Sequence, residues 1–401
     1  MDATAASVDA TAESSANSYA ILAKLATGGM AELFLARTAS SAGVERYVVL
    51  KRVLPHRLHD HHFVSMFLDE ARLAAQLQHP NIAQVFDTGK LGDSYFFSME
   101  YVHGETVREL AYRAYELGEA IPLGCVLTIA ASAAAGLHHA HERLGLDGTP
   151  LGIVHRDVSP SNLMVSYEGN VKLVDFGVAK MTDRTVETQT GTVKGKISYL
   201  SPEQCRGRVA DRRSDLFSLG IVLWELLVGD RLYKRDSDYD AMETIVHELP
   251  APPSQFRAEV PAELDAVVMK LLAKAPGDRY QTADELYDEL EHLADRHAIR
   301  MSNAALKRFM VELFGKRPEP WIELRTRDTA AEVITVSAAI AGRDSTLTVL
   351  DSQLLKVFDL TSTRTPEHPA TRAVPAPTPI PAEDAPARTQ SRVPWLVAGA
   401  A

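Results

Sequence analysis

Residues 155–177 read HRDVSPSNLMVSYEGNVKLVDFG, and this stretch decides how the chain folds. Leu163–Ser166 and Val171–Val174 are short apolar runs on either side of a Glu-Gly-Asn turn, a pattern that predicts a β-hairpin. A hairpin brings the loop that precedes it beside the loop that follows it. The polar residues of those two loops are therefore expected to meet at one end of the hairpin.

Three acid or amide side chains stand in these loops: Asp157, Asn162 and Asp175. One carboxylate can orient a hydroxyl nucleophile, while a carboxylate and an amide hold a magnesium ion against phosphate groups. The three residues together indicate phosphoryl transfer. A D-F-G tripeptide alone recurs by chance, but the eight-residue loop, the hairpin and D-F-G in this order form a specific pattern.

At these residues the chain resembles the protein kinase superfamily, in its bacterial serine/threonine (Hanks-type) branch. The resemblance implies an α+β fold of two lobes: an N-lobe of antiparallel strands with one main helix, αC, and a mainly helical C-lobe. It implies ATP and Mg²⁺ as cofactors, with Mn²⁺ as an alternative ion. It assigns Asp157 to orienting the hydroxyl group, and Asn162 and Asp175 to the metal.

The composition is that of a globular protein from a reducing compartment. The 401 residues are 46% hydrophobic, enough for a sizeable core. The net charge of −11 argues against a general nucleic-acid binder, and two cysteines, Cys125 and Cys205, provide no disulfide framework. Residues 1–17 lack the basic start and apolar core of a signal peptide and are expected to form a disordered leader. We therefore expect a cytoplasmic protein.

A tight loop near the N-terminus resembles the loop that covers the ATP phosphates in kinases. Ala20–Leu25 and Glu32–Ala36 are expected strands on either side of it, and the kinase pattern is G-x-G-x-x-G-x-V. Ala26 and Ala31 replace the first and third glycines, which predicts a working but less adaptable loop. The resemblance places seven residues at the nucleotide: Ala26, Thr27, Gly28, Gly29, Met30, Ala31 and Leu33.

A lysine and a glutamate are expected to form the ion pair that anchors ATP. Tyr47–Lys51 reads as a strand ending in the lysine, and Phe63–Leu77 has a helical apolar period that includes Glu70. The resemblance implies a Lys51–Glu70 pair that sets the lysine on the α- and β-phosphates. A lysine on an exposed strand edge is the alternative.

Residues 100–104 resemble the hinge between the lobes. In the family the hinge backbone binds adenine, which places Glu100 and Val102 at the nucleotide. Met99, at the end of the preceding strand, would guard the back of the pocket, although it also suits a buried strand end.

The C-lobe is predicted to be built on two buried helices. Pro122 opens a helix that runs to about Leu144, and residues 216–227 form another that is apolar nearly all round. Asp215 is expected to cap free amides at the start of the second helix. The resemblance further pairs Glu203 with Arg279, and it assigns Arg156 to binding a phosphate on the activation segment.

Two positions, Ser159 and Lys196, differ from the usual residues of serine/threonine kinases. Serine/threonine kinases usually carry a lysine where Ser159 stands, and a threonine where Lys196 stands. In the family these positions meet at the catalytic aspartate, so Lys196 is hypothesised to neutralise the γ-phosphate in the transition state. A lysine that only tunes substrate specificity is the alternative. Thr188 and Thr190 match the autophosphorylation sites of bacterial kinases.

The rest of the chain divides by composition. A helix over Ser302–Phe314 is expected to pack on the C-lobe, and Val333–Val336 and Thr346–Leu350 are β-like runs. An apolar end behind two arginines suggests either the start of a membrane helix, which would anchor the protein, or a mildly apolar tail. The expected ranges are 1–17 leader; 18–297 kinase domain (N-lobe 18–100, hinge 100–104, C-lobe 105–297); 298–330 helical extension; 331–360 unassigned element; 361–392 Pro/Ala-rich linker; and 393–401 apolar tail.

The sequence thus predicts transfer of the ATP γ-phosphoryl group to serine or threonine of proteins, including the chain itself, with self-association for autophosphorylation in trans. No nucleic-acid partner is expected. A pseudokinase scaffold is the main alternative, favoured by the alanines of the phosphate loop and by Ser159. A tyrosine kinase is a third reading: Ser159 leaves room for it, and the segment Ser201–Gln204 opposes it.

Overall fold

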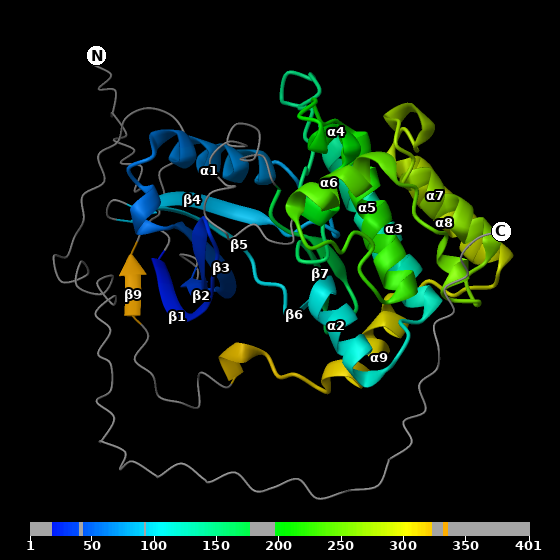
Figure 1. Cartoon of the computed structure of the whole chain (residues 1–401). Helices are drawn as coiled ribbons and strands as arrows, with labels where there is room; N and C mark the ends of the chain where they lie inside the picture. The colour runs from blue at the N-terminus through cyan, green and yellow to red at the C-terminus, as the bar shows by residue number, and fades with distance from the viewer. Residues whose placement is uncertain (1–17, 40–42, 92–93, 177–196, 323–331, 336–401) are drawn as a thin grey trace, which may run out of the picture. The chain divides into compact units, whose positions relative to one another are not determined.

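The fold is given by a computed structural model that describes residues 18–39, 43–91, 94–176, 197–322 and 332–335 (Figure 1). All of these residues belong to one compact unit, Met1–Leu350. They form an N-lobe of antiparallel strands with one helix and a mainly helical C-lobe. The fold class expected from the sequence is confirmed.

One antiparallel sheet makes up most of the N-lobe, in the strand order β4-β5-β3-β2-β1-β9. Helix α1 begins after Asp60, whose side chain accepts a hydrogen bond from the Phe63 amide, and it packs on the sheet through Phe67 and Ala71. The bounds are β1 Ser18–Thr27, β2 Ala31–Ala39, β3 Glu45–Val53, α1 His61–Ala74, β4 Val85–Leu91, β5 Ser94–Glu100 and β9 Glu332–Thr335.

The C-lobe surrounds two buried helices, α3 and α5. Both are apolar nearly all round, so other elements pack around them, and they contribute many residues to one large core. The bounds are α2 Val107–Leu117, α3 Leu123–His141, α4 Pro202–Cys205, α5 Arg212–Val228, α6 Asp238–His247, α7 Ala262–Leu271, α8 Ala283–Arg296 and α9 Asn303–Phe314.

The predicted catalytic hairpin is confirmed. Its strands are β7 (Leu163–Ser166) and β8 (Val171–Leu173), and β6 (Gly104–Thr106) pairs with β7. The loop that follows α1 is bonded to this hairpin, because the Leu173 amide donates to the Asn81 carbonyl and the Ala83 amide donates to the Leu173 carbonyl. The end of α1 is therefore fixed to the strand that leads into Asp175.

The predicted end of α3 is wrong. The helix ends at His141, and Leu144, which was expected on its buried face, is 53% exposed. Leu144 instead pairs with Pro150 in a small hairpin. Asp147 closes the tip of this hairpin by accepting hydrogen bonds from the backbone amide and hydroxyl of Thr149. These local bonds offer the backbone an alternative to a further helical turn.

The chain beyond the expected kinase domain joins both lobes. Helix α9 lies where a helix was expected and is capped by Ser302, and its residues Leu306, Phe309 and Met310 lie in the C-lobe core, as expected. Strand β9 lies in the expected β-like run and pairs with β1, so the element left unassigned from the sequence contributes a strand to the N-lobe sheet. The leader, linker and apolar tail lie outside the described residues.

Within the described ranges, α3 alone is long and apolar enough to cross a membrane. Most of its residues are buried in the C-lobe core, where an apolar helix of this length is expected in a globular fold.

Replacing Ala298 with glycine tests the backbone conformation after α8. It has a φ of 52°, in the left-handed region where a Cβ is strained. Ala298→Gly should raise the free energy of unfolding by about 1 kcal/mol. Gly118, with a φ of 69° after α2 and open space around its Cβ position, is the matched control: Gly118→Ala should lower stability by a similar amount. Urea unfolding measures both, and a loss of stability in Ala298→Gly would contradict the assignment.

Candidate active site

Lys51 of β3 lies at the centre of the site. Its ammonium group contacts a carboxylate oxygen of Glu70 from α1 at 3.0 Å and one of Asp175 at 2.9 Å. Burial alone would lower the pKa of Lys51, but the two carboxylates outweigh burial and raise this pKa above its usual value. The expected Lys51–Glu70 pair is present, and Lys51 is charged at any physiological pH.

Asp157 and Asn162 are held together in the loop before β7. The Asn162 side-chain amide donates to the Asp157 carboxylate and to its backbone carbonyl, each at 2.8 Å. The Val174 amide donates to the Asn162 carbonyl at 3.0 Å, so Asn162 lies beside the chain that enters Asp175. The structure therefore brings together the three residues that the hairpin argument predicted.

His155 links the two loops, a role that the sequence did not indicate. Its Nε2 lies 3.2 Å from the Val174 carbonyl, and its Nδ1 lies 3.3 Å from the Asp157 amide. The tautomer with the proton on Nε2 satisfies both contacts, since Nε2 then donates and Nδ1 accepts. The ring also packs against Phe176, with 4.6 Å between centroids. His155 thereby connects Asp157 with the loop that carries Asp175.

The expected role of Asp215 as a helix cap is wrong. Asp211 caps α5 by accepting from the Arg213 amide, whereas Asp215 lies in the first turn and is fully buried. Its carboxylate accepts hydrogen bonds from the backbone amides of His155 at 2.8 Å and Arg156 at 2.7 Å. These bonds offset the left-handed backbone of Arg156, whose φ is 62°. Asp215 therefore fixes the backbone of the catalytic loop.

His141 supports Asp215 from the last turn of α3. Its Nε2 donates to the Asp215 carboxylate at 2.8 Å, and both side chains are about 1% exposed. No motif in the sequence indicated a role for His141. The available signal was a histidine on an otherwise apolar face, which in a buried position requires a polar partner.

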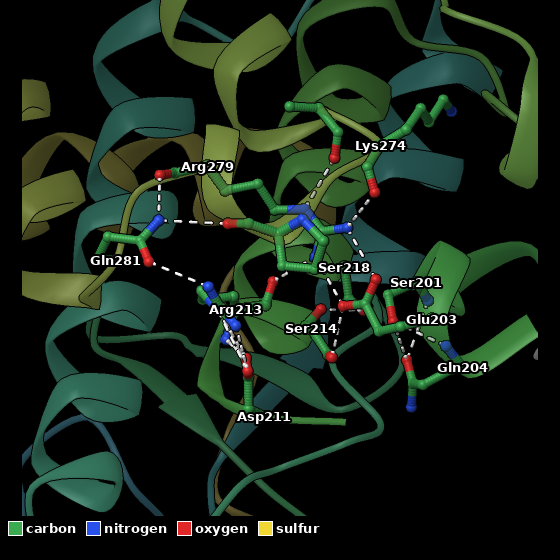
Figure 2. A network of polar contacts seen from close by, with 12 residues as sticks. Ser201, Glu203, Gln204, Asp211, Arg213, Ser214, Ser218, Lys274, Arg279 and Gln281 are labelled. Carbon is green, nitrogen blue, oxygen red and sulfur yellow. Dashed lines mark hydrogen bonds and ion pairs between the residues drawn. The ribbon is translucent and has the colours of Figure 1, made fainter. Parts of the chain in front are cut away.

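The expected pair between Glu203 and Arg279 is confirmed. The two side chains form bonds of 2.7 and 2.8 Å, and the Arg279 side chain is fully buried (Figure 2). Glu203 also accepts from Ser214 of α5, and Gln204 donates to the Arg156 carbonyl. The end of the activation segment is thus tied to the helix that carries Asp215 and to the catalytic loop.

The residues expected around the nucleotide lie on both sides of Lys51. The phosphate loop spans the turn between β1 and β2, where the Gly28 amide donates to the Ala31 carbonyl at 2.9 Å. Gly28 does not have a positive φ, so the turn itself does not require a glycine there. Met99 is the residue before the end of β5 and lines a cavity of about 20 Å³ with Phe176, room for one water molecule. The effect of the two alanines on loop movement stays a prediction.

The oxygen atoms at this site suit magnesium. Asn162 uses its amide nitrogen to hold Asp157, which leaves its amide oxygen as the metal-binding atom, and Asp175 adds a carboxylate. One or two carboxylates plus substrate phosphates are the usual ligands of Mg²⁺. No group of three or more His, Cys, Asp or Glu side chains gathers among the described residues, so phosphates would complete the coordination. When bound, the ion neutralises charge on the phosphate oxygens.

Several predicted residues lie outside the described ranges. Lys196, Thr188 and Thr190 fall in residues 177–196, so the hypothesis for Lys196 and the two phosphorylation sites stay predictions. Ser159 is 3% exposed, and its hydroxyl oxygen has no hydrogen-bond partner among the described residues. Arg156 is half-buried, and this burial lowers the pKa of its guanidinium, a cost that a bound anion would relieve.

The chain matches the model of the protein kinase domain over residues 19–290. It belongs to the protein kinase family. The sequence also resembles curated bacterial kinases: it is 44% identical over 298 residues to Tyrosine-protein kinase MasK of Myxococcus xanthus, covering 74% of this chain and 46% of that protein. It is 40% identical over 271 residues to Serine/threonine-protein kinase PknB of Mycobacterium leprae, covering 66% of this chain and 41% of that protein.

Solved structures agree with this assignment. The kinase domain of Mycobacterium tuberculosis PknI matches with a TM-score of 0.53 at 28% identity, covering 69% of this chain and 96% of that domain. The kinase spans less than half the length of the curated relatives named above. The relatives place it in the bacterial Hanks-type branch, as the sequence predicted.

Glu70→Gln tests the ion pair of Lys51. A neutral amide keeps the shape of Glu70 but removes one of the two charges that hold the ammonium group. The catalytic efficiency kcat/KM for ATP should fall about 10- to 100-fold, equivalent to about 1.5–3 kcal/mol for a hydrogen bond to a charged group. Asp69→Asn is the matched control, because Asp69 is exposed on the same helix and pairs with Arg72 rather than with Lys51 among the described residues. Equal kinetics in both variants would rule out the role given to Glu70.

Lys274 predicts a pH dependence of stability. Burial, with Arg279 nearby, lowers its pKa from 10.5 to about 8. Between these values the unfolded chain binds more protons than the folded kinase, so this residue's contribution to stability should increase as pH rises from 8 to 10. The free energy of unfolding of the wild type should therefore rise relative to that of Lys274→Met as pH increases from 8 to 10.

The control for that experiment is Lys234→Met, which removes an exposed lysine in the same lobe. It measures the effect of losing a lysine charge at the surface, which is subtracted from the result for Lys274→Met. A difference between wild type and Lys274→Met that stays constant from pH 8 to 10 would contradict the lowered pKa of Lys274.

Proposed function

We propose that this protein kinase transfers the γ-phosphoryl group of ATP to serine and threonine side chains of proteins, including its own Thr188 and Thr190. Lys51 would hold the α- and β-phosphates, Asn162 and Asp175 the metal, and Asp157 the hydroxyl group of the substrate. Hinge residues 100–104 would bind adenine through their backbone.

The observation that carries the proposal is the double contact of Lys51 with Glu70 and Asp175, at 3.0 and 2.9 Å. It requires α1, β3 and the loop after β8 to be in place together, which is the arrangement that phosphoryl transfer by kinases needs. Asp157 lies in the neighbouring loop, held by Asn162. A pseudokinase would have no need of all five residues, so we favour an active enzyme.

Tyrosine phosphorylation is the second candidate. It is favoured by two observations: one similar relative is named a tyrosine kinase, and Ser159 stands where serine/threonine kinases usually carry a lysine. We prefer serine and threonine because the PknB relatives, at about 40% identity, are named serine/threonine kinases.

Phosphoamino acid analysis separates these candidates. The purified kinase is incubated with γ-labelled ATP and Mg²⁺, and phosphoserine and phosphothreonine are expected in the hydrolysate. Asp157→Asn should reduce incorporation about 10²- to 10⁴-fold, because the hydroxyl group loses its proton acceptor. Asp288→Asn, which changes an exposed carboxylate on α8, should retain the wild-type rate. Phosphotyrosine as the sole product would establish the second candidate instead.

The location and assembly of the protein are further proposals. We propose that it acts in the cytoplasm, with attachment to a membrane if the apolar run at 393–401 belongs to a membrane helix. We also propose that two copies associate transiently, so that one phosphorylates the activation segment of the other. Neither proposal rests on the described residues.

A further inference from the structure

The segment that follows the C-lobe returns to the N-lobe past the hinge. Figure 1 shows it leaving α9 and running toward the side of β1 and β2. Within it, Trp321 packs against Tyr101 of the hinge and Tyr47 of β3, and β9 pairs with β1. We call residues 303–322 the strap.

The N-terminal part of the strap, helix α9, is fixed to the catalytic hairpin. Gly169, in the turn between β7 and β8, lies so close to α9 that an added Cβ would be 2.0 Å from the Asn303 carbonyl oxygen. Lys307 forms an ion pair with Glu168 in the same turn. Near the C-terminal end of α9, the Arg113 side chain of α2 donates to the Leu313 carbonyl at 3.2 Å. The strap therefore begins from a fixed point at the turn of the catalytic hairpin.

A continuous series of aromatic rings connects this anchor with the N-lobe along the hinge. Each ring contacts the next, and the rings come in turn from α9, the hairpin turn, the hinge, the strap and β3. The distances between centroids are 6.4 Å for Phe314–Tyr167, 4.8 Å for Tyr167–His103, 6.4 Å for His103–Tyr101, 5.7 Å for Tyr101–Trp321 and 4.0 Å for Trp321–Tyr47.

The contact between Trp321 and Tyr47 is the tightest in the series. The ring planes differ by 6°, so the two rings are stacked, whereas Trp321 meets Tyr101 edge to face at 72°. Tyr47 directly precedes Val48, which pairs with Glu100 at the start of the hinge. Trp321 therefore touches the hinge on one side and, on the other, the strand that leads to Lys51.

Charge and burial around Tyr101 agree with this packing. Burial raises the pKa of the Tyr101 hydroxyl, and Glu105 and Glu319 raise it further. Glu319 belongs to the strap, so the strap approaches the hinge at more than one residue. The neighbouring Glu100 is held separately, by an ion pair with Lys172 of β8 at 2.9 Å.

We propose that Trp321 is a positioning residue for nucleotide binding, which acts by holding hinge residue Tyr101 against β3. The strap would keep the hinge backbone in the conformation that receives adenine, so that the free enzyme does not have to order it on binding. Trp321 has no role in the chemical step. The inference rests on the proposed function in one respect, namely that adenine binds at the hinge.

The test compares Trp321→Ala with Ile322→Ala in the full chain. Ile322 is the next residue and is 52% exposed, which makes it a matched control. Trp321→Ala should raise the KM and the Kd for ATP about 3- to 10-fold, as expected for loss of a stacked aromatic pair, with kcat unchanged. Trp321→Phe should restore most of the affinity. Hydrogen exchange of the amides of residues 100–104 should be faster in Trp321→Ala only.

A double-mutant cycle with Tyr47→Ala identifies the contact responsible. If Trp321 acts through Tyr47, the effect of the two changes together should be smaller than the product of their separate effects. Trp321→Phe retains a ring, so it can replace Trp321→Ala in the cycle and in the exchange experiment if the alanine variant is less stable. Wild-type ATP affinity and unchanged hinge exchange in Trp321→Ala would overturn the inference. Absence of turnover in the wild type would instead contradict the proposed function.

Discussion

The site depends on the ammonium group of Lys51, which contacts two carboxylates that are distant from each other in the sequence. Lys51, Glu70 and Asp175 come from β3, α1 and the loop after β8, so the contact joins the N-lobe helix, the N-lobe sheet and the C-lobe. The lysine and the glutamate are little exposed, and separating either from its partner would leave a charge with poor solvation. The relative position of the lobes is therefore tied to the geometry at which phosphates would bind.

A second polar network supports the C-lobe side of the site. Asp215 and the Glu203–Arg279 pair are buried within the helical core, where an unpaired charge would be costly. Each is fully occupied: Asp215 by backbone amides of the catalytic loop and by His141, and Glu203 by Arg279 and Ser214. The two networks have different tasks. The network around Lys51 positions the positive charge at the nucleotide site. The network around Asp215 and Arg279 holds the loop that carries Asp157.

The sequence predicted the parts of the fold that depend on local pattern. The hairpin followed from two apolar runs and a turn, and the Lys51–Glu70 and Glu203–Arg279 pairs followed from motifs with family spacing. It failed where a residue's distant partner is not indicated by such a motif. Asp215 looked like a cap because it stands at a helix start, but the amides that it binds belong to the catalytic loop. Trp321 carries no motif, and only the return of the chain to β3 reveals its contacts.

The pairing of β9 with β1 has a consequence for solubility. Without β9, the outer backbone of β1 would present unpaired amide and carbonyl groups at the edge of the sheet, and such an edge invites pairing with another chain. A shorter protein that ends soon after α8 would have this edge uncovered. Its aggregation, or its apparent dimerisation, would then reflect the missing strand rather than the behaviour of the intact kinase.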